Sequence, residues 1–259
     1  MKAFRRLGVT ALLIVFTGLL TVPAGAQFQP VNANLEFQGG MQVYSLSGTT
    51  RSNGGSDVDV KSDMGLSSEL DFELGLRYQS RQKQGFRFSW SRFNFTGNRT
   101  LDRNITYSNK TFSNGTDINS KLNVQFIDID SEYRLTQQKR DDFFNITSGA
   151  RIIDYEGEIS STSKTARSKF TGGLPVLGFS FRKYFDPGFF IAGRYQWMDI
   201  SFGSNDWRMI DGEASVAFNP VEDLWIMGSY NDFNIEGSHD EDSLDMDYRG
   251  PNIRALLYF

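Results

Sequence analysis

The chain contains one histidine, and this side chain is the first candidate for acid–base chemistry. His239 follows Ser238 and precedes Asp240 in a polar segment near the C-terminus. A catalytic base needs an oriented partner within hydrogen-bond reach, and a Ser–His hydrolase needs a third group that orients the histidine. Adjacency in sequence does not supply that arrangement. We therefore expect no catalytic residue, and we expect the His239→Ala variant to keep its fold and its surface display.

Carboxylates are the second candidates, because two acidic clusters could bind divalent cations through oxygen. Neither cluster has the EF-hand pattern with its central glycine. Blocks of like charge usually repel one another and stay solvated. We therefore predict no metal site and no bound cofactor. The clusters are Asp57, Asp59 and Asp63 near the N-terminus, and Asp240, Glu241, Asp242, Asp245 and Asp247 near the C-terminus.

The beginning of the chain has the features of an export signal. Three basic residues among the first six precede an apolar run from Leu7 to Leu20, and the small residues Ala24 to Ala26 follow. The run is shorter than the ~20 residues of a membrane-spanning helix, which disfavours the alternative of an uncleaved anchor. We predict a signal peptide over residues 1–26 and a single domain over residues 27–259.

Charge and composition exclude several classes of partner. Removing the three basic residues of the signal leaves 24 basic residues against 31 acidic ones, a net charge of −7. This balance argues against a nucleic-acid partner. The chain has no cysteine, so an exported domain must hold together without disulfides, and a closed hydrogen-bonded barrel does so. A mean hydropathy of −0.40 fits such a barrel, in which only alternate residues face lipid.

Alternation of apolar and polar residues with period two is the dominant pattern. From Leu70 to Gln79 every second residue is apolar, and the residues between are mostly charged or polar. Successive side chains of a strand point to opposite faces, so this segment has one lipid-like face and one charged face. The pattern predicts an all-β, antiparallel, up-and-down transmembrane barrel of ten strands, and counts from eight to twelve remain compatible. The other nine segments begin near Leu35, Phe86, Ile127, Phe144, Leu177, Phe189, Ile210, Leu224 and Ile253.

A few residues depart from the alternation. Pro175 and Pro251 are expected near strand ends, where a missing donor matters less. Large apolar residues also fall on the polar face of two strands, which β-bulges or strands rising above the bilayer would explain. These residues are Phe93, Phe95, Leu122, Val124 and Phe126.

The connections between strands alternate in length, as in bacterial outer-membrane barrels. Short turns are expected on the periplasmic side, together with both termini. The 97–120 segment contains almost nothing that could cover a core. The long polar connections, expected to be extracellular loops, are Ser47–Met64, Gly97–Ser120, Glu158–Lys169 and Glu236–Asp247.

Aromatic residues near the strand ends favour a membrane barrel over a secreted, lipocalin-like barrel, which has the same period but an apolar interior. Such residues suit the two interfacial depths of a bilayer. The expected girdles are Tyr78, Phe86, Tyr133, Phe181, Tyr184, Phe189 and Phe218 near the short turns, and Trp90, Tyr155, Trp197 and Tyr230 near the long loops.

The last eight residues resemble the C-terminal β-signal of outer-membrane proteins. Leu257 and Phe259 share the apolar face, although Arg254 stands where that signal usually has glycine. The resemblance implies the outer membrane of a Gram-negative-type bacterium. It implies outer-membrane lipids and the barrel assembly machinery as partners, and we expect a monomer.

A second resemblance concerns chemistry. Asp128 and Asp130 are similar to one acidic pair of the ten-stranded omptin proteases, which use a histidine at the extracellular rim. Here, however, the two residues alternate with apolar residues in mid-strand, and the spacing of His239 and Asp240 differs from that family. We therefore predict a non-enzymatic barrel with a structural or surface-binding role. A narrow channel for small solutes or ions is the first alternative, and an omptin-like or lipid-modifying hydrolase is the second.

The inward faces predict a lumen filled with balanced charge. Arginine pairs well with carboxylates, so we expect these groups to cross-link the interior, with Arg77 and Glu73 as one pair. The acids are Glu36, Asp71, Glu73, Asp128, Asp130, Glu132, Asp211 and Glu213, and the bases are Arg77, Arg87, Arg134, Arg151, Arg182, Arg194 and Arg254.

Overall fold

The structure is a computed structural model that describes residues 34–80, 83–135, 142–185, 188–203, 205–221, 223–239 and 241–259. The predicted signal peptide lies outside these residues. Within them, no helix is long and apolar enough to cross a membrane.

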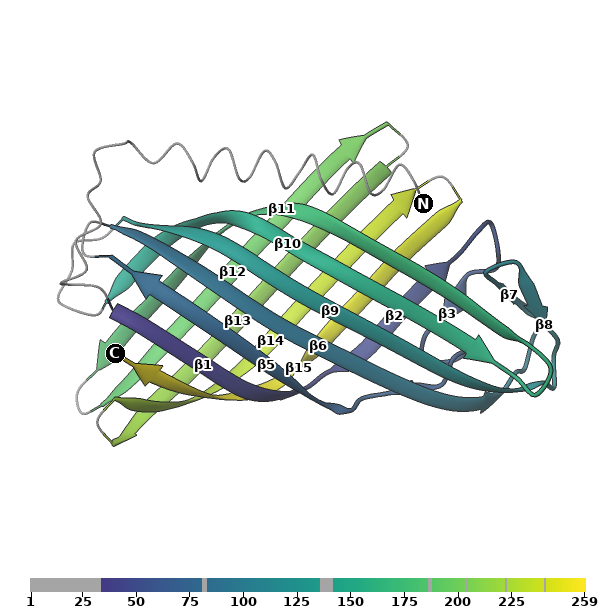
Figure 1. Ribbon diagram of the computed structural model, residues 1–259, viewed down its shortest axis with the longest axis horizontal. Helices are drawn as coiled ribbons and strands as arrows, with labels where there is room; N and C mark the ends of the chain where they lie inside the picture. The colour runs from purple at the N-terminus through teal and green to yellow at the C-terminus, as the bar shows by residue number, and fades with distance from the viewer. Residues whose placement is uncertain are drawn as a thin grey trace.

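The described residues form a closed barrel of ten antiparallel strands (Figure 1), as the alternation predicts. Neighbouring barrel strands are consecutive along the chain, and the last strand closes on the first. The first strand is interrupted at Tyr44 and is labelled in two parts. The strands are β1 (Asn34–Val43) with β2 (Ser45–Arg51), β5 (Leu70–Gln79), β6 (Gln84–Thr100), β9 (Asp117–Arg134), β10 (Phe143–Ser160), β11 (Thr165–Phe185), β12 (Phe189–Phe202), β13 (Asn205–Val221), β14 (Leu224–His239) and β15 (Asp242–Tyr258).

The outer surface of the barrel changes from apolar to polar along the strands. In the half that holds Asn34 and Phe259, outward side chains are apolar, and Leu70, Phe72 and Leu74 are 55–57% exposed. In the other half, outward positions are polar and inward positions are apolar, as Asn119 and Leu122 illustrate on β9. This half therefore rises above the bilayer.

The apolar residues that depart from the alternation are explained by this change. Phe93 and Phe95 keep the inward phase of β6, and the pairing of β6 with β9 runs without a shift from Gln84 to Thr100. The tall-strand explanation is confirmed and the bulge explanation is wrong for this pair.

The barrel interior has three layers. At the end near Asn34 and Phe259, Phe190, Met227 and Leu256 form a small apolar cluster with Tyr184 and Trp225 packed against it. The middle layer is charged, and the upper layer is the main apolar core. Tyr184 and Tyr155, expected in the aromatic girdles, point inward instead, because each has the inward phase of its strand.

Two of the expected long loops are mostly strand. β10 and β11 continue to Ser160 and Thr165, and β14 and β15 continue to His239 and Asp242. Their polar composition arises because their outward faces meet water above the membrane, so a strand there resembles a loop in sequence.

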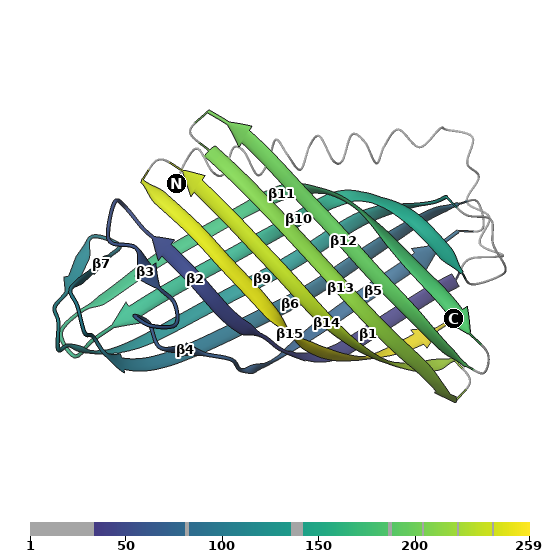
Figure 2. The same ribbon diagram turned by 180° about the vertical axis from the view of Figure 1, so that it is seen from behind.

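The remaining long connections fold over the barrel mouth (Figure 2). Loop 1, residues 52–69, contains the short strands β3 (Val58–Asp59) and β4 (Leu66–Ser67). Loop 2, residues 101–116, contains the hairpin of β7 (Ile105–Tyr107) and β8 (Lys110–Phe112). The prediction that the 97–120 segment covers no core is wrong. Its scattered apolar residues gather on one side once it folds, and they are Leu101, Ile105, Tyr107, Phe112 and Ile118.

Pro175 and Pro251 lie inside long strands, not near strand ends, and each coincides with an interruption of pairing. Backbone N–H direction alternates along a strand. The Ser161 N–H donates to the Lys164 carbonyl at 2.8 Å, so even-numbered residues of β11 face β10 and odd-numbered residues face β12. Pro175 therefore lacks a donor toward β12, and the β11–β12 ladder ends nearby at the pair Leu177–Trp197.

Pro251 acts in the same way where β15 pairs with the first strand and closes the barrel. The Phe259 N–H donates to the Leu35 carbonyl at 2.9 Å, so odd-numbered residues of β15 face the first strand. Pro251 has no N–H to donate there, and Val43 and Tyr44, between the pairs of Gln42 and Ser45, are not paired to β15. Its position explains why the first strand is divided at Tyr44.

Candidate functional site

The charged middle layer is an ion-pair network that crosses the lumen. Arg182 of β11 holds Glu36 of β1 with two hydrogen bonds, at 2.7 Å between Nη1 and Oε2 and 3.2 Å between Nη2 and Oε1. Arg151 of β10 joins Asp128 and Asp211, each at 2.5 Å. All of these side chains are buried. The prediction that inward charges cross-link the interior is confirmed for these groups.

Individual partners differ from the expected ones. Arg77 and Glu73 lie on the same face of β5 but do not pair. The Arg77 Nε donates to the Glu132 Oε2 of β9 at 2.8 Å, and Glu73 accepts from Arg254 of β15. Long side chains reach past the adjacent strand, so spacing along one strand does not identify the partner.

Asp71 is also outside the network. Its carboxylate accepts hydrogen bonds from the Asn94 backbone N–H at 3.1 Å and from the Asn94 side chain at 2.8 Å. These bonds lie just beyond the last β5–β6 pair, Glu73–Ser91, so Asp71 satisfies backbone groups at the end of that ladder.

The cavity beside the charged layer is small. A cavity of about 50 Å³ lies between the charged layer and the upper core, bordered by Arg151, Arg254 and Phe126 among others. Such a volume holds a few water molecules at most. The described interior therefore contains packed side chains where a channel would need a continuous path.

The residues considered for hydrolysis are not brought together. Asp128 and Asp130 are buried in the charged layer, and Asp128 is held by Arg151. The His239 backbone pairs with Asp242 at the tip of β14, six residues beyond Phe233, which contacts Arg151. Six strand residues correspond to about 20 Å. The side chain of His239 and all of Asp240 lie outside what the structure describes.

The acidic clusters do not form a metal site in the described residues, where no three potential ligands gather. In loop 1, Asp63 accepts hydrogen bonds from Arg103 of loop 2 and from the Asp59 backbone N–H. Burial raises the pKa of Asp63, but these donors outweigh burial and hold it below the usual value. The carboxylate thus fastens loop 1 to loop 2.

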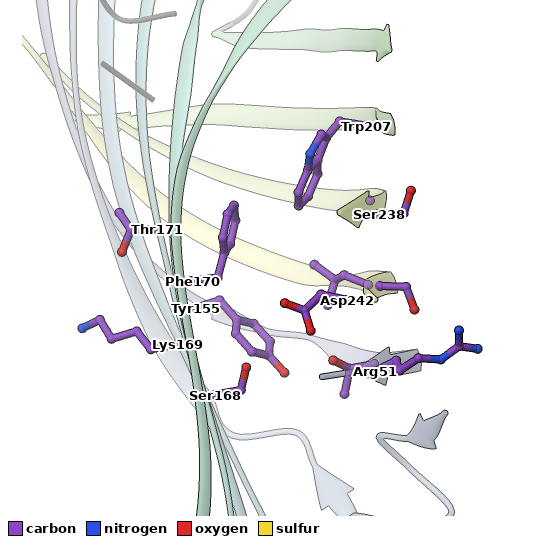
Figure 3. Close-up of a pocket in the computed structure, with 13 residues that line it drawn as sticks. Arg51, Tyr155, Ser168, Lys169, Phe170, Thr171, Trp207, Ser238 and Asp242 are labelled. Atoms are coloured by element: carbon purple, nitrogen blue, oxygen red, sulfur yellow. The ribbon is translucent and has the colours of Figure 1, made fainter. Parts of the chain in front are cut away.

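A cavity of about 250 Å³ at the end of the barrel opposite Asn34 and Phe259 is the strongest candidate for a ligand site (Figure 3). It lies between β11 on one side and the upper ends of β2, β13, β14 and β15 on the other. Its apolar lining includes Tyr155, Phe170, Trp207 and Leu244, while Thr50, Ser168 and Asp242 contribute polar groups. An apolar cavity with a few polar groups is the usual form of a small-molecule site.

Two stacked rings form one wall of this cavity. Phe170 and Trp207 have centroids 5.3 Å apart and planes inclined by 12°. Each ring lies against a glycine: a Cβ on Gly172 would be 2.4 Å from the Phe170 ring, and one on Gly237 would be 2.3 Å from Trp207. Sequence reasoning missed this cavity. The glycines in strands were the available signal, because they mark close approach of other groups.

The rim of the cavity carries charged groups that are already partnered. Arg51 pairs with Asp57 at 2.7 Å, and Lys169 lies 3.8 Å from Asp154. The hydrogen bond from Arg51 lowers the pKa of Asp57. The rim is therefore polar and of mixed charge, above an apolar interior.

Comparisons with known proteins agree with this architecture. No protein-family profile matches the sequence, and no curated protein matches it. Among solved structures, the outer-membrane protease OmpT of Escherichia coli is similar over 91% of this chain and 99% of its own, with a TM-score of 0.54 and 10% identity. The fold is that of an outer-membrane β-barrel. The outward apolar belt suits a barrel that crosses a membrane, and the outer membrane of a Gram-negative bacterium remains the location that the sequence predicts.

Two further structures share less of the geometry. The translocator domain of the autotransporter NalP from Neisseria meningitidis has a TM-score of 0.45 and 8% identity, over 97% of this chain and 98% of its own. Ail, the attachment invasion locus protein of Yersinia pestis, has a TM-score of 0.36 and 12% identity, over 86% and 99%.

Proposed function

We propose that this chain is a non-enzymatic outer-membrane binding protein whose ligand site is the 250 Å³ cavity at the extracellular end. The observation that carries the proposal is an apolar cavity with a polar rim, above a charged layer whose own cavity is only about 50 Å³. A small, mainly apolar molecule with one hydrogen-bonding group fits this lining. The protein acts as a monomer in outer-membrane lipids, inserted by the barrel assembly machinery.

The filled lumen favours binding over conduction. A solute would have to pass the upper core, the ion pairs of Arg151 and Arg254, and the cluster around Phe190. Removing one partner of a buried ion pair costs about 3–5 kcal/mol, so the charged layer is not readily displaced. Purified protein in planar bilayers is expected to show no porin-sized conductance steps, and large stable steps would favour the channel instead.

Binding is tested with 4-bromobenzyl alcohol, whose bromine quenches tryptophan fluorescence on contact. The test protein is the full chain with Trp90, Trp197 and Trp225 changed to Phe, so that only Trp207 reports. We expect saturable quenching of Trp207, and we expect Ser168→Phe, which fills the cavity, to weaken it at least tenfold. Thr50→Phe provides a second filling variant, since Ser168 also hydrogen-bonds Ser52.

The matched control is Ser148→Phe, the same substitution at an exposed, outward position of β10. It should leave the quenching within twofold of the parent. Quenching that stays linear with concentration, or that both filling variants retain, would contradict a ligand site in this cavity.

A further inference from the structure

The wall of the barrel is split beside the cavity. β11 pairs with β10 along most of its length, from Thr165 to Arg182, but with β12 only from Leu177 to Phe185. β12 continues upward on β13 to the pair Phe202–Asn205. Figures 1 and 2 both show the upper ends of β11 and β12 diverging. The missing donor of Pro175 accounts for the point of separation.

The cavity lies against the unpaired edge of β11. Its lining includes Ser168 and Phe170, which point inward, and also Lys169 and Thr171, which have the outward phase of the same strand. Figure 3 shows Lys169 and Thr171 on the opposite side of the β11 ribbon from Phe170. β11 has no partner strand on its β12 side over these residues, so the cavity lies directly against the split.

The split begins where the lipid-facing belt ends. Leu177 and Trp197, the last pair, are outward and 54% and 43% exposed. Tryptophan favours the interfacial depth of a membrane. On the far side of the split, Ile200 has the inward phase of β12 and is still 40% exposed, because no strand covers it. An apolar path therefore runs from the outer surface of the bilayer toward the cavity.

The edge of β11 above the opening is covered. The Ser108 hydroxyl donates to the Arg167 carbonyl at 2.7 Å, and the Lys110 ammonium donates to the Thr165 carbonyl. Both donors belong to the hairpin of loop 2. The hairpin shields these backbone groups from strand addition and confines the opening to the stretch between Lys169 and Pro175.

We propose that the split is a side portal through which an amphiphile of the outer leaflet places its apolar chain in the cavity. This inference rests on the proposed function and adds the ligand class and its route. A cavity of 150 Å³ can hold a benzene molecule, so 250 Å³ has room for a short alkyl segment or a substituted ring. The polar head stays on the rim, where Lys169, Arg51 and Asp242 lie.

The test measures how fast a chain-brominated dodecyl maltoside quenches Trp207 in the variant described above, reconstituted in lipid nanodiscs. The natural chain has no cysteine, so a cysteine pair can be introduced without competition. Gly173→Cys with Ser201→Cys places thiols at positions that would face each other if the β11–β12 register continued. A short bismaleimide then joins the two sides of the split.

We expect this staple to slow quenching by the brominated maltoside at least tenfold. The control staple joins Phe179→Cys to Tyr195→Cys, which are already paired below the split, and should change the rate less than twofold. The water-soluble 4-bromobenzyl alcohol provides the second arm, because it can also reach the cavity from above the membrane. Its quenching should fall less than threefold when the split is stapled.

The outcomes separate this proposal from the proposed function. If 4-bromobenzyl alcohol binds but the split staple leaves the maltoside rate unchanged, the portal is wrong and the cavity remains a ligand site. If neither probe quenches Trp207 saturably, the ligand site itself is wrong. Slowing by the split staple alone supports the portal.

Discussion

At the scale of single residues, the charged layer shows which carboxylate each lumen arginine pairs with. Carboxylates from several strands surround each arginine in the lumen, and many of the ion pairs join strands that are not adjacent. Arg254 of β15 contacts Glu73 of β5 and Glu213 of β13. Alternation in the sequence places these charges inside correctly, but the partner depends on the curvature of the closed barrel, which no single strand encodes.

A pair of double-mutant cycles tests these assignments. Arg254→Met and Glu73→Gln should each destabilise the barrel, and the coupling between them should be about 1–3 kcal/mol because the two groups are in contact. Arg77→Met with Glu73→Gln is the matched control, and these residues should be nearly additive. The measurement is urea-induced unfolding from lipid vesicles. Coupling confined to Arg77 and Glu73 would reverse the assignment.

At the scale of elements, strand existence follows from alternation, whereas strand length and loop structure do not. A strand above the membrane alternates polar residues outside with apolar or small residues inside, so Glu158–Lys169 resembles a loop in composition although most of it is β-strand. The cavity depends on still less visible features. The run Gly172–Gly173–Leu174–Pro175 disfavours regular strand pairing. The sequence does not show, however, that β12 separates from β11 at this point.

Pro175→Val is expected to restore pairing at this edge. A residue with an N–H at this position can donate toward Asp199 of β12, which continues the existing register. Amide hydrogen exchange at Asp199 and Ser201 should slow at least tenfold in the variant. Replacement of Pro220 by Val, near the β13–β14 turn, is the control and should leave those two amides unchanged. Unaltered exchange in Pro175→Val would show that the proline does not cause the split.

The stabilisation that the Asp63 carboxylate gives to the contact between loop 1 and loop 2 should depend on pH. The pKa of Asp63 is lowered in the folded protein, so its contribution to stability is complete above the unfolded value of about 3.9 and is lost as pH falls through the lowered value. Asp63→Asn should therefore lower the melting temperature at pH 7, and the difference from the parent should shrink as the pH approaches 2. The exposed carboxylate Asp206, changed to Asn, should have little effect at either pH. A constant difference for Asp63→Asn would contradict this role.

At the scale of the whole molecule, one continuous sheet has a lower part that faces lipid and an upper part that faces water. Below the level of Leu177 and Trp197 its outer face is apolar and its interior is charged, and above that level the arrangement reverses. The reversal follows from the surroundings, because lipid accepts only apolar side chains and the water-exposed part must enclose a conventional core. The β11–β12 ladder ends at the same level, so the cavity lies at the junction of the two environments.

Arginine substitutions at different heights test this division. Leu74→Arg lies in the middle of the outward apolar face of β5 and should cost about 2–4 kcal/mol, the range for arginine near the bilayer midplane. Asn119→Arg, outward and exposed on the upper part of β9, should remain within about 0.5 kcal/mol of the parent, as surface substitutions usually do. Leu122→Arg, three residues away and fully buried, should prevent stable folding because it places an unpaired charge in the upper core. Folding free energies in vesicles check all three, and a large cost at Asn119 would mean that the bilayer extends higher than the apolar belt.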